Sequence, residues 1–233
     1  MCTLTFVPKG ETDFILTSNR DEAFLRKTVP PQEYIENNRK VIYPKDALAG
    51  GTWLGLSDRK RVVCLLNGGF EMHQRQSQYR MSRGIIVKEV LTVEDVKTYI
   101  DTFDFTDIEP FTLVVVQWQE HIEIIELVWD GHKKHIQLLP TSPQIWSSSS
   151  LYTQAMKKQR HQWFYEFIEA QPPTSERLWE FHHTAGIGDK NIDLQIDRGF
   201  LKTVSTTQII KYNDTTSFNY EDLQSKKIYK QEL

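Results

Sequence analysis

The order in which strands and helices are predicted along the chain constrains the fold more than any other feature of the sequence. A block of strands is followed by two amphipathic helices, and the succession repeats before a closing group of strands. Strands that follow one another directly pair as antiparallel hairpins, whereas parallel strands need a crossover, usually a helix, between them. The block order therefore predicts an α+β protein in which helices cover the outside of antiparallel sheets.

The first block opens with a hairpin at the N-terminus. Residues 2–7 alternate, which predicts Cys2 on the face that carries Leu4 and Phe6, and residues 13–18 return beside them after a short turn. The polar run that follows, residues 19–22 with the sequence Asn-Arg-Asp-Glu, would then lie beside Cys2.

Two further segments precede the first helices. Residues 21–45 are mostly polar and contain three prolines, so we expect a long ordered loop that covers a site. Residues 61–66 are apolar and β-branched, which predicts a strand buried on both faces. This strand ends at Asn67-Gly68-Gly69, where the backbone can adopt positive φ and approach a ligand closely.

The remaining elements follow from periodicity and capping residues. Four helices are predicted: one that begins near Ser82, one capped by Thr92, a long one over residues 151–170 and a short one capped by Thr174. Strands are predicted at residues 111–118, 121–129, 135–139, 204–212, 218–223 and 226–229.

Length, charge and cysteine content exclude several classes of protein. The chain has 233 residues, a net charge of −3 and no linker-like or repeated segment, so we expect one domain over residues 1–233. The charge gives no attraction for nucleic acid, and no apolar run approaches the ~18 residues of a membrane span. With no signal peptide and only Cys2 and Cys64, a reducing, cytoplasmic location is expected.

Cys2 is the strongest candidate for a nucleophile. If Met1 is removed, the chain begins with a cysteine that carries both a thiol and a free α-amine, the pairing found in N-terminal nucleophiles. The amine, with an ordinary pKa of about 7.7–8.0, could accept a proton, and Arg20 nearby would favour the thiolate. Asn67 could stabilise an oxyanion or simply form an Asn-Gly turn. The alternative for Cys2 is a small apolar residue in the first strand.

Neither a metal nor another cofactor is expected. The histidine pairs 132/135 and 182/183 lack accompanying cysteine or acidic ligands, and adjacent residues on a helix do not face one site. The Gly-Gly pairs lack the lysine and hydroxyl residue of a phosphate loop. Three arginines surround the predicted start of the first helix and would suit either a bound anion or a solvated basic turn: Arg75, Arg80 and Arg83.

Five short segments occur in an order typical of one family. They are Met1-Cys2-Thr3, Asn19-Arg20-Asp21-Glu22, Gly50-Gly51-Thr52-Trp53-Leu54-Gly55, Leu66-Asn67 and Arg83-Gly84. Together they resemble the NRDE family, also called the transport and Golgi organisation family. The resemblance runs from residue 1 to about residue 170, with a weaker similarity at residues 202–210.

The resemblance implies an N-terminal-nucleophile hydrolase fold, a four-layer αββα sandwich of two antiparallel sheets flanked by helices. It implies catalytic roles for Cys2 as nucleophile, Asp21 as carboxylate and Arg20 and Asn67 as supporting groups. The substrate-binding residues that the resemblance implies are Asn19, Trp53 and Arg83 from the shared segments and Ser149 by its spacing.

The sequence departs from the more distant penicillin acylase and bile-salt hydrolase group at two places. In that group the arginine lies on the other side of an asparagine, so Arg20 has a different relation to the thiol. That group also uses an asparagine in a later segment, where this chain has Ser147–Ser150. Ser149 is the best match there by spacing, and a serine is a weaker oxyanion donor.

Two functions are compatible with these residues. The first is a cysteine amidohydrolase that acts on a small-molecule or non-peptide amide C–N bond after Met1 has been removed. The second is a binding or trafficking module without turnover, because relatives in eukaryotes are associated with membrane organisation and haem handling. The expected partner is a small-molecule substrate or a hydrophobic ligand, and no axial-ligand motif points to haem.

Overall fold

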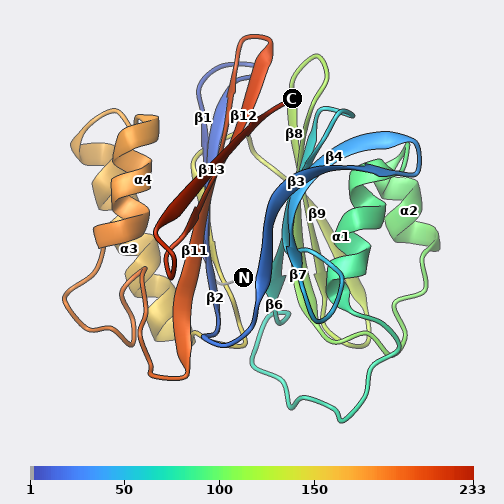
Figure 1. The fold of residues 1–233 in the computed structure, drawn as a ribbon, viewed down its shortest axis with the longest axis horizontal. Helices are drawn as coiled ribbons and strands as arrows, with labels where there is room; N and C mark the ends of the chain where they lie inside the picture. The colour runs from blue at the N-terminus through green and yellow to red at the C-terminus, as the bar shows by residue number, and fades with distance from the viewer. Residues whose placement is uncertain (1–2) are drawn as a thin grey trace.

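The computed structural model describes residues 3–233, and its elements form four layers (Figure 1). Two antiparallel sheets lie face to face, with one pair of helices on the outside of each. Helices α3 (Gln154–Ala170) and α4 (Ser175–Thr184) cover one sheet, and α1 (Arg83–Thr92) and α2 (Val96–Thr102) cover the other. The predicted α+β class and the αββα arrangement are confirmed.

The sheet next to α3 and α4 has six strands and joins distant parts of the chain. Its order is β10-β1-β2-β11-β12-β13, so the N-terminal hairpin is flanked by a strand from mid-chain and by the closing strands. The strands are β1 (Thr3–Pro8), β2 (Phe14–Ala23), β10 (Gln144–Ser147), β11 (Leu201–Tyr212), β12 (Thr215–Asp222) and β13 (Lys227–Glu232).

The sheet next to α1 and α2 has seven strands that pair in sequence order from β3 to β9. Consecutive strands usually lie side by side, and here β6 and β7 pair although α1 and α2 lie between them in the chain. The strands are β3 (Thr28–Glu36), β4 (Arg39–Asp46), β5 (Leu54–Ser57), β6 (Arg61–Asn67), β7 (Phe111–Trp118), β8 (Ile122–Trp129) and β9 (Lys134–Leu139).

Alternation along the N-terminal hairpin assigns its side chains to two separate cores. Leu4 and Leu16 belong to the core between the two sheets, as do the other residues of the same parity. Val7 and Ile15 instead pack with Phe164 and other residues of α3 and α4. Because successive side chains of a strand point to opposite faces, one hairpin contributes to both interfaces.

The loop expected over residues 21–45 is wrong, because β2 extends to Ala23 and β3 and β4 form a hairpin. The two prolines at positions 30 and 31 lie where the pairing register shifts between Val29 and Gln32. They also lie on β3, which is an edge strand of its sheet. A proline is compatible with a strand at such places, since no ladder hydrogen bond is required of it.

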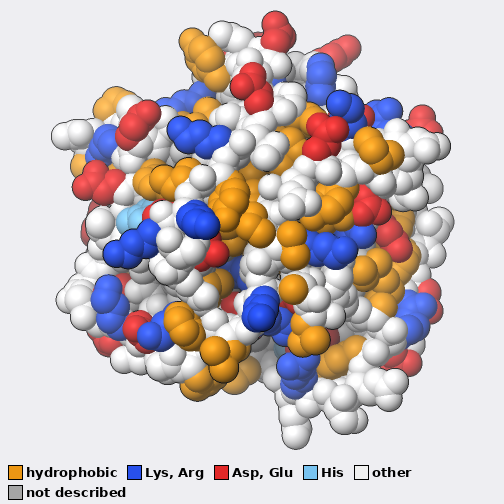
Figure 2. Space-filling view, in the orientation of Figure 1, with side chains coloured by type: hydrophobic (Ala, Val, Ile, Leu, Met, Phe, Trp, Pro, Cys, Tyr) orange, Lys and Arg blue, Asp and Glu red, His pale blue; other side chains and the backbone are white. Residues whose placement is uncertain are grey.

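Two of the three predicted capping residues are confirmed, because Ser82 and Thr174 accept backbone hydrogen bonds at the starts of α1 and α4. Thr153, which was not predicted as a cap, does so at the start of α3. Thr92, expected to cap α2, is instead the last residue of α1, and Asp95 caps α2. No helix within residues 3–233 combines the length and the apolar character needed to cross a membrane. On the face shown in Figure 2, basic and acidic side chains are interspersed.

Candidate active site

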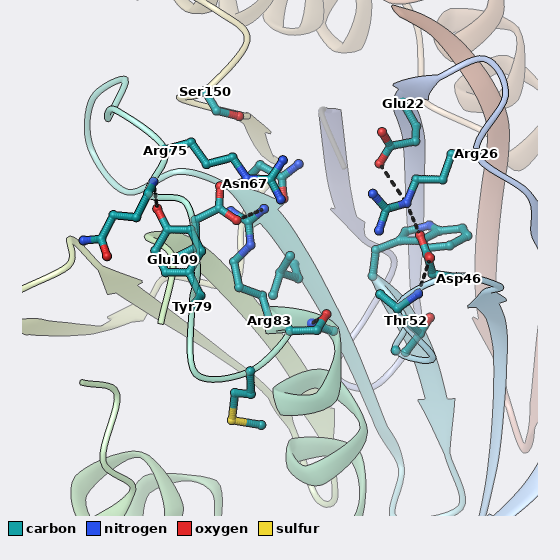
Figure 3. A pocket seen from close by; sticks show the side chains of 18 of the residues that line it. Glu22, Arg26, Asp46, Thr52, Asn67, Arg75, Tyr79, Arg83, Glu109 and Ser150 are labelled. Carbon is teal, nitrogen blue, oxygen red and sulfur yellow. Dashed lines mark hydrogen bonds and ion pairs between the residues drawn. The ribbon is translucent and has the colours of Figure 1, made fainter. Parts of the chain in front are cut away.

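A cavity of about 690 Å³ lies where β2, β4 and β6 end near the start of α1. Four of the predicted site residues line it: Arg20, Trp53, Asn67 and Arg83. Figure 3 shows two groups of charged side chains facing one another across this space. Glu22, Arg26 and Asp46 lie on one side, and Arg75, Arg83 and Glu109 lie on the other.

Backbone contact between two glycines brings the Gly-Gly-Thr-Trp turn against the start of α1. A Cβ atom at Gly51 would lie 2.6 Å from the carbonyl carbon of Gly84, and one at Gly84 would lie 2.7 Å from the Thr52 oxygen. The Thr52 N–H donates to the Gly84 carbonyl at 3.2 Å. Only residues without a side chain permit this approach, and it places Trp53 and Arg83 in the same cavity.

Arg20 is a buried cation in the wall of the cavity. Its side chain is 3% exposed, and its guanidinium donates to the Asp46 carboxylate at 2.9 Å and to the Thr28 hydroxyl at 2.7 Å. The guanidinium carbon lies 3.8 Å from the centre of the Trp53 ring, a cation–π contact. Burial lowers the pKa of Arg20, but a guanidinium stays protonated in proteins. The cavity wall therefore carries a fixed positive charge.

Asp46 holds two arginines at once. The Arg26 Nε atom lies 2.6 Å from the carboxylate oxygen that Arg20 also contacts, and the N–H groups of Leu48 and Ala49 donate to the other oxygen. Burial raises the pKa of Asp46, but the hydrogen bonds from Arg26 and Ala49 outweigh it, and the pKa of this carboxyl lies below its ordinary value. Asp46 is thus an anion that orients Arg20.

The opposite wall repeats this arrangement around Glu109. Arg83 lies 3.1 Å from Glu109 and donates to the Pro110 carbonyl at 2.9 Å. Arg75 is more distant, at 3.9 Å from Glu109, and its side chain is 75% exposed. Burial lowers the pKa of Arg83. The buried arginines of both walls are therefore held by carboxylates, whereas Arg75 is largely exposed to solvent.

Asn67 ends β6 at the floor of the cavity, and its main chain contacts the serine run. Its carbonyl accepts hydrogen bonds from the Ser148 hydroxyl at 2.7 Å and from the Ser150 N–H at 3.3 Å. Gly68 has a φ of +88°, and a Cβ atom there would lie 2.9 Å from the Ser150 nitrogen. The predicted positive-φ turn after Asn67 is confirmed at Gly68, and it allows residues 67–69 to pack against residues 148–150.

Asn19 does not line the cavity, because its side chain points toward the helical layer. Its amide donates to the carbonyls of His182 and Leu194 at 2.9 and 3.0 Å, and its oxygen accepts from Thr206 at 3.0 Å. The side chain is fully buried. These contacts tie β2 to α4 and β11, so the structure gives Asn19 a supporting position and no contact with the cavity.

Asp21 also faces the helical layer, and two hydroxyl groups hold its carboxylate. Thr203 donates at 2.6 Å, and Tyr152 donates to the other oxygen. Asp21 pairs with Thr203 in register, beside a β-bulge in β11 between Thr203 and Ser205. Bulges of this kind re-aim side chains and are common next to active sites.

A buried arginine continues this network to the first strand. Arg160 is completely buried, lies 3.5 Å from the centre of the Tyr152 ring and donates to the Thr3 hydroxyl at 2.6 Å. It also donates to the carbonyls of Ile192 and Asp193. Arg160 therefore connects the start of β1 to the tyrosine that holds Asp21.

The side chain of Ser149 does not line this cavity, although Ser149 belongs to the segment 148–150 that packs against residues 67–69. Its hydroxyl donates to the Gly69 carbonyl and accepts from the Lys157 ammonium at 2.5 Å. Ser150, the next residue, lines the cavity instead. The structure thus separates Ser149 from Arg20, Trp53, Asn67 and Arg83. Cys2, the predicted nucleophile, lies outside the described residues.

Several residues of the site were not predicted. Asp46 directly follows residues 21–45, the segment expected to be a loop, so its position at the end of β4 was not predicted. Tyr152 and Thr203 come from distant parts of the chain and reach Asp21 only in three dimensions. Cys64 lies in the strand that was predicted to be buried on both faces, and it is fully buried, which raises its pKa to about 12.

The described histidines take structural positions. His182 is fully buried between the Thr5 hydroxyl at 2.8 Å and the Asn19 oxygen at 3.2 Å, and burial lowers its pKa to about 3. His135 is bonded to Asp130 across a hairpin turn. Within residues 3–233, no group of three His, Cys, Asp or Glu side chains is arranged to hold a metal ion.

Comparison with known proteins relates the chain to one family and one fold. The family model described as Transport and Golgi organisation 2 matches residues 1–215. No curated protein matches the chain.

Three solved structures are similar over most of their length, with TM-scores of 0.60. A Caenorhabditis elegans N-acylethanolamine-hydrolyzing acid amidase ortholog is 14% identical, covering 90% of this chain and 92% of its own. A variant of conjugated bile acid hydrolase from Clostridium perfringens is 9% identical, covering 99% and 92%. Penicillin V acylase from Agrobacterium tumefaciens is 10% identical, covering 100% and 86%. At these identities the similarity concerns the fold.

Proposed function

The chain belongs to the transport and Golgi organisation 2 family and has the N-terminal-nucleophile hydrolase fold, and from this premise we propose that it is a cysteine amidohydrolase. Its substrate is a small molecule with a non-peptide amide C–N bond. The neighbours with this fold are named as an acid amidase, a hydrolase and an acylase. The enzyme acts after removal of Met1, which gives Cys2 a free α-amine.

The observation that carries the proposal is the meeting of Arg20 and Asn67 in one cavity beside the start of β1. Thr3, the first described residue, pairs in register with Asn19, so Arg20 and Asp21 directly follow the residue opposite it. Asn67 reaches the same place from the other sheet. A cation and an amide from separate parts of the chain therefore line one cavity, and Asp21 follows Arg20 on the opposite face of β2.

The proposed reaction proceeds in two steps. The Cys2 thiol transfers its proton to its own α-amine, and the sulfur attacks the amide carbonyl carbon. The side-chain amide of Asn67 donates to the oxyanion, while Arg20 favours the thiolate and Asp21 helps to orient the amine. The C–N bond breaks as the leaving nitrogen takes the proton, and a thioester forms. Water then cleaves the thioester, releasing a carboxylic acid and restoring the thiol.

The size of the cavity supports a small substrate. Its volume of about 690 Å³ falls within the range of roughly 300–1,000 Å³ typical of small-molecule sites. Its walls carry the paired charges of Arg20, Asp46, Arg83 and Glu109. Because these groups are already paired, they favour a substrate that offers polar hydrogen-bonding atoms.

Intact mass and thiol labelling test the proposal directly. Because Cys64 is buried and its pKa is raised to about 12, an electrophile at neutral pH reports on Cys2. We expect a protein that lacks Met1 and takes one label. Cys64→Ser should be labelled equally, and Cys2→Ser should not be labelled.

Turnover of a library of N-acyl amides provides the second measurement. We expect Asn67→Ala to lower kcat by about 10²–10³-fold, as loss of one oxyanion donor does, while labelling of Cys2 is retained. A retained Met1, or acyl transfer that does not need Cys2, contradicts the hydrolase. If such a protein still binds a hydrophobic ligand or haem saturably, the binding module without turnover replaces the proposal.

A further inference from the structure

A second cavity, of about 530 Å³, lies on the other side of the packed segments 67–69 and 148–150, which we call the partition. Its walls are part polar and part apolar, and the apolar part includes Leu66, Val128 and Trp146. Lys157 from α3 supplies a cation, and Ser149, separated from the first cavity, lines this one. The proposed reaction uses none of these walls.

Lys157 is half-buried and has no anionic partner. Its ammonium donates to the Ser149 hydroxyl at 2.5 Å, and within residues 3–233 it forms no ion pair with a carboxylate. Burial lowers its pKa. By contrast, Arg20 and Arg83 in the first cavity are each held by a carboxylate. A partly buried charge of this kind is stabilised by an anion that enters the cavity.

The start of α3 adds to the positive potential at this end of the cavity. Backbone N–H groups give a helix N-terminus a partial positive charge, which favours acidic residues there and disfavours lysine. The first turn of α3 contains no acidic residue, whereas Lys157 and Lys158 follow its N-cap Thr153 closely. An anion bound beside Lys157 would relieve this unfavourable arrangement.

The opposite wall suits an apolar or aromatic group. The Trp146 indole N–H donates to Glu126 at 2.7 Å, which fixes the ring and occupies one carboxylate oxygen. Phe70 lies at the mouth with half of its side chain exposed, in edge-on contact with the His135 ring. Rigid aromatic walls of this kind bind flat or aliphatic groups.

We propose that the second cavity binds a small organic carboxylate with an apolar body. The carboxylate pairs with the Lys157 ammonium, and the apolar body packs against Trp146 and Val128. This site is independent of the proposed hydrolase function, because it requires neither Cys2 nor the walls of the first cavity.

Calorimetric titration with hexanoate tests the site, with hexan-1-ol as the neutral analogue of the same length. We expect hexanoate to bind more tightly than the alcohol. Lys157→Gln should weaken hexanoate binding roughly tenfold or more, as loss of a charge-assisted hydrogen bond does. Lys226→Gln, which removes an equal charge from an exposed site that does not line this cavity, should change it by about twofold or less, because solvent and salt screen an exposed charge.

The position of the bound acid is read from the Trp146 indole signal in a ¹H–¹⁵N spectrum, assigned by its loss in Trp146→Phe. Hexanoate should shift this signal. The proposal is wrong if millimolar hexanoate gives neither heat nor a shift, or if Lys157→Gln binds it as well as the original chain does. Loss of binding in Arg83→Gln but not in Lys157→Gln would place the acid in the first cavity and would also overturn the proposal.

Discussion

The two faces of β2 use the same four-residue run in different ways. Arg20 and Glu22 point between the sheets, where Arg20 is paired with Asp46 and stacked on Trp53. Asn19 and Asp21 point toward α3, α4 and β11, where Asn19 bonds to backbone carbonyls and Asp21 accepts from the hydroxyls of Tyr152 and Thr203. One face of the strand therefore builds a charged cavity wall, and the other anchors that wall to the helical layer.

This difference explains why consecutive polar residues are compatible with the middle of a buried sheet. Successive side chains find their partners alternately on the two faces of the strand, so no single interface has to accommodate the whole run. Substitutions on the cavity face should chiefly affect how the buried charge of Arg20 is compensated. Disturbing the helical face should chiefly affect hydrogen bonding and the protonation state of its groups.

The largest effect is expected on the cavity face, from Asp46→Asn. This change leaves Arg20 buried beside a neutral amide, with Glu22 at 3.7 Å as its remaining carboxylate within residues 3–233. We expect the free energy of unfolding to fall by about 3–5 kcal/mol, as it does when one partner of a buried ion pair is removed. Urea unfolding measures this loss.

The matched control is Asp58→Asn, because Asp58 pairs with Arg39 at 3.1 Å and both side chains are about one-third exposed. Asp58→Asn should lower the free energy of unfolding by less than about 1 kcal/mol. Equal losses in the two variants would show that burial of Arg20 does not depend on its carboxylate.

On the helical face, the next effect is a pH dependence that arises from His182. Its pKa is about 3 in the folded protein because of burial, against an ordinary value of 6.5. The unfolded chain therefore binds more protons in this interval, and stability falls as the pH drops below 6.5. The fall is about 1.4 kcal/mol per pH unit until the folded pKa is reached.

Urea unfolding at pH values from 7 to 4 separates this contribution from that of the carboxylates. His182→Gln should show a shallower dependence, and His161→Gln, at an exposed site, should keep the original slope. If both variants lose stability with pH as the original chain does, His182 is protonated without cost and its assigned role is wrong.

A smaller loss of stability is expected from Tyr152→Phe, which removes one hydrogen-bond donor to the buried Asp21 carboxylate. Hydrogen bonds to charged groups contribute about 1.5–3 kcal/mol, and we expect a loss in this range. Tyr165→Phe removes a neutral bond to the Pro143 carbonyl at 2.9 Å and should cost about 1 kcal/mol. Thermal unfolding of the two variants compares them, and a larger loss at Tyr165 would contradict the ranking.

The smallest effect is expected from Glu22→Gln at the rim of the cavity. Glu22 is 24% exposed, and its contacts with Arg20 and Arg26 are long, at 3.7 and 3.9 Å. Solvent screens such a pair, so the free energy of unfolding should change by less than about 1 kcal/mol. A loss comparable to that of Asp46→Asn would show that the two carboxylates share the compensation of Arg20.

The sequence predicted those parts of the fold that local chemistry decides. Alternation in β1 and β2, the caps at Ser82 and Thr174 and the positive-φ turn at Gly68 depend on neighbouring residues. The order of strand and helix blocks predicted antiparallel sheets for the same reason. Resemblance to a family supplied the four-layer arrangement, which periodicity alone does not specify.

The same local signals failed at residues 28–46, where prolines indicated a loop. A strand at a sheet edge does not need every backbone donor, and a register shift accommodates adjacent prolines. β3 and β4 pair with each other, and β4 also pairs with β5, a strand that follows the segment in the chain. Composition within the segment carries no information about that partner.

The sequence by itself determined which polar residues were available near the N-terminus, and that they alternate on a strand. Only the tertiary structure decided that Arg20, Trp53, Asn67 and Arg83 share one cavity, that Asn19 and Asp21 face the helices and that Ser149 belongs to another space. The physical reason is that a buried charge takes its partner from whatever lies nearest in space. For Arg20 this is Asp46, from the neighbouring sheet, and for Asp21 it is Tyr152 and Thr203, which are distant in the chain.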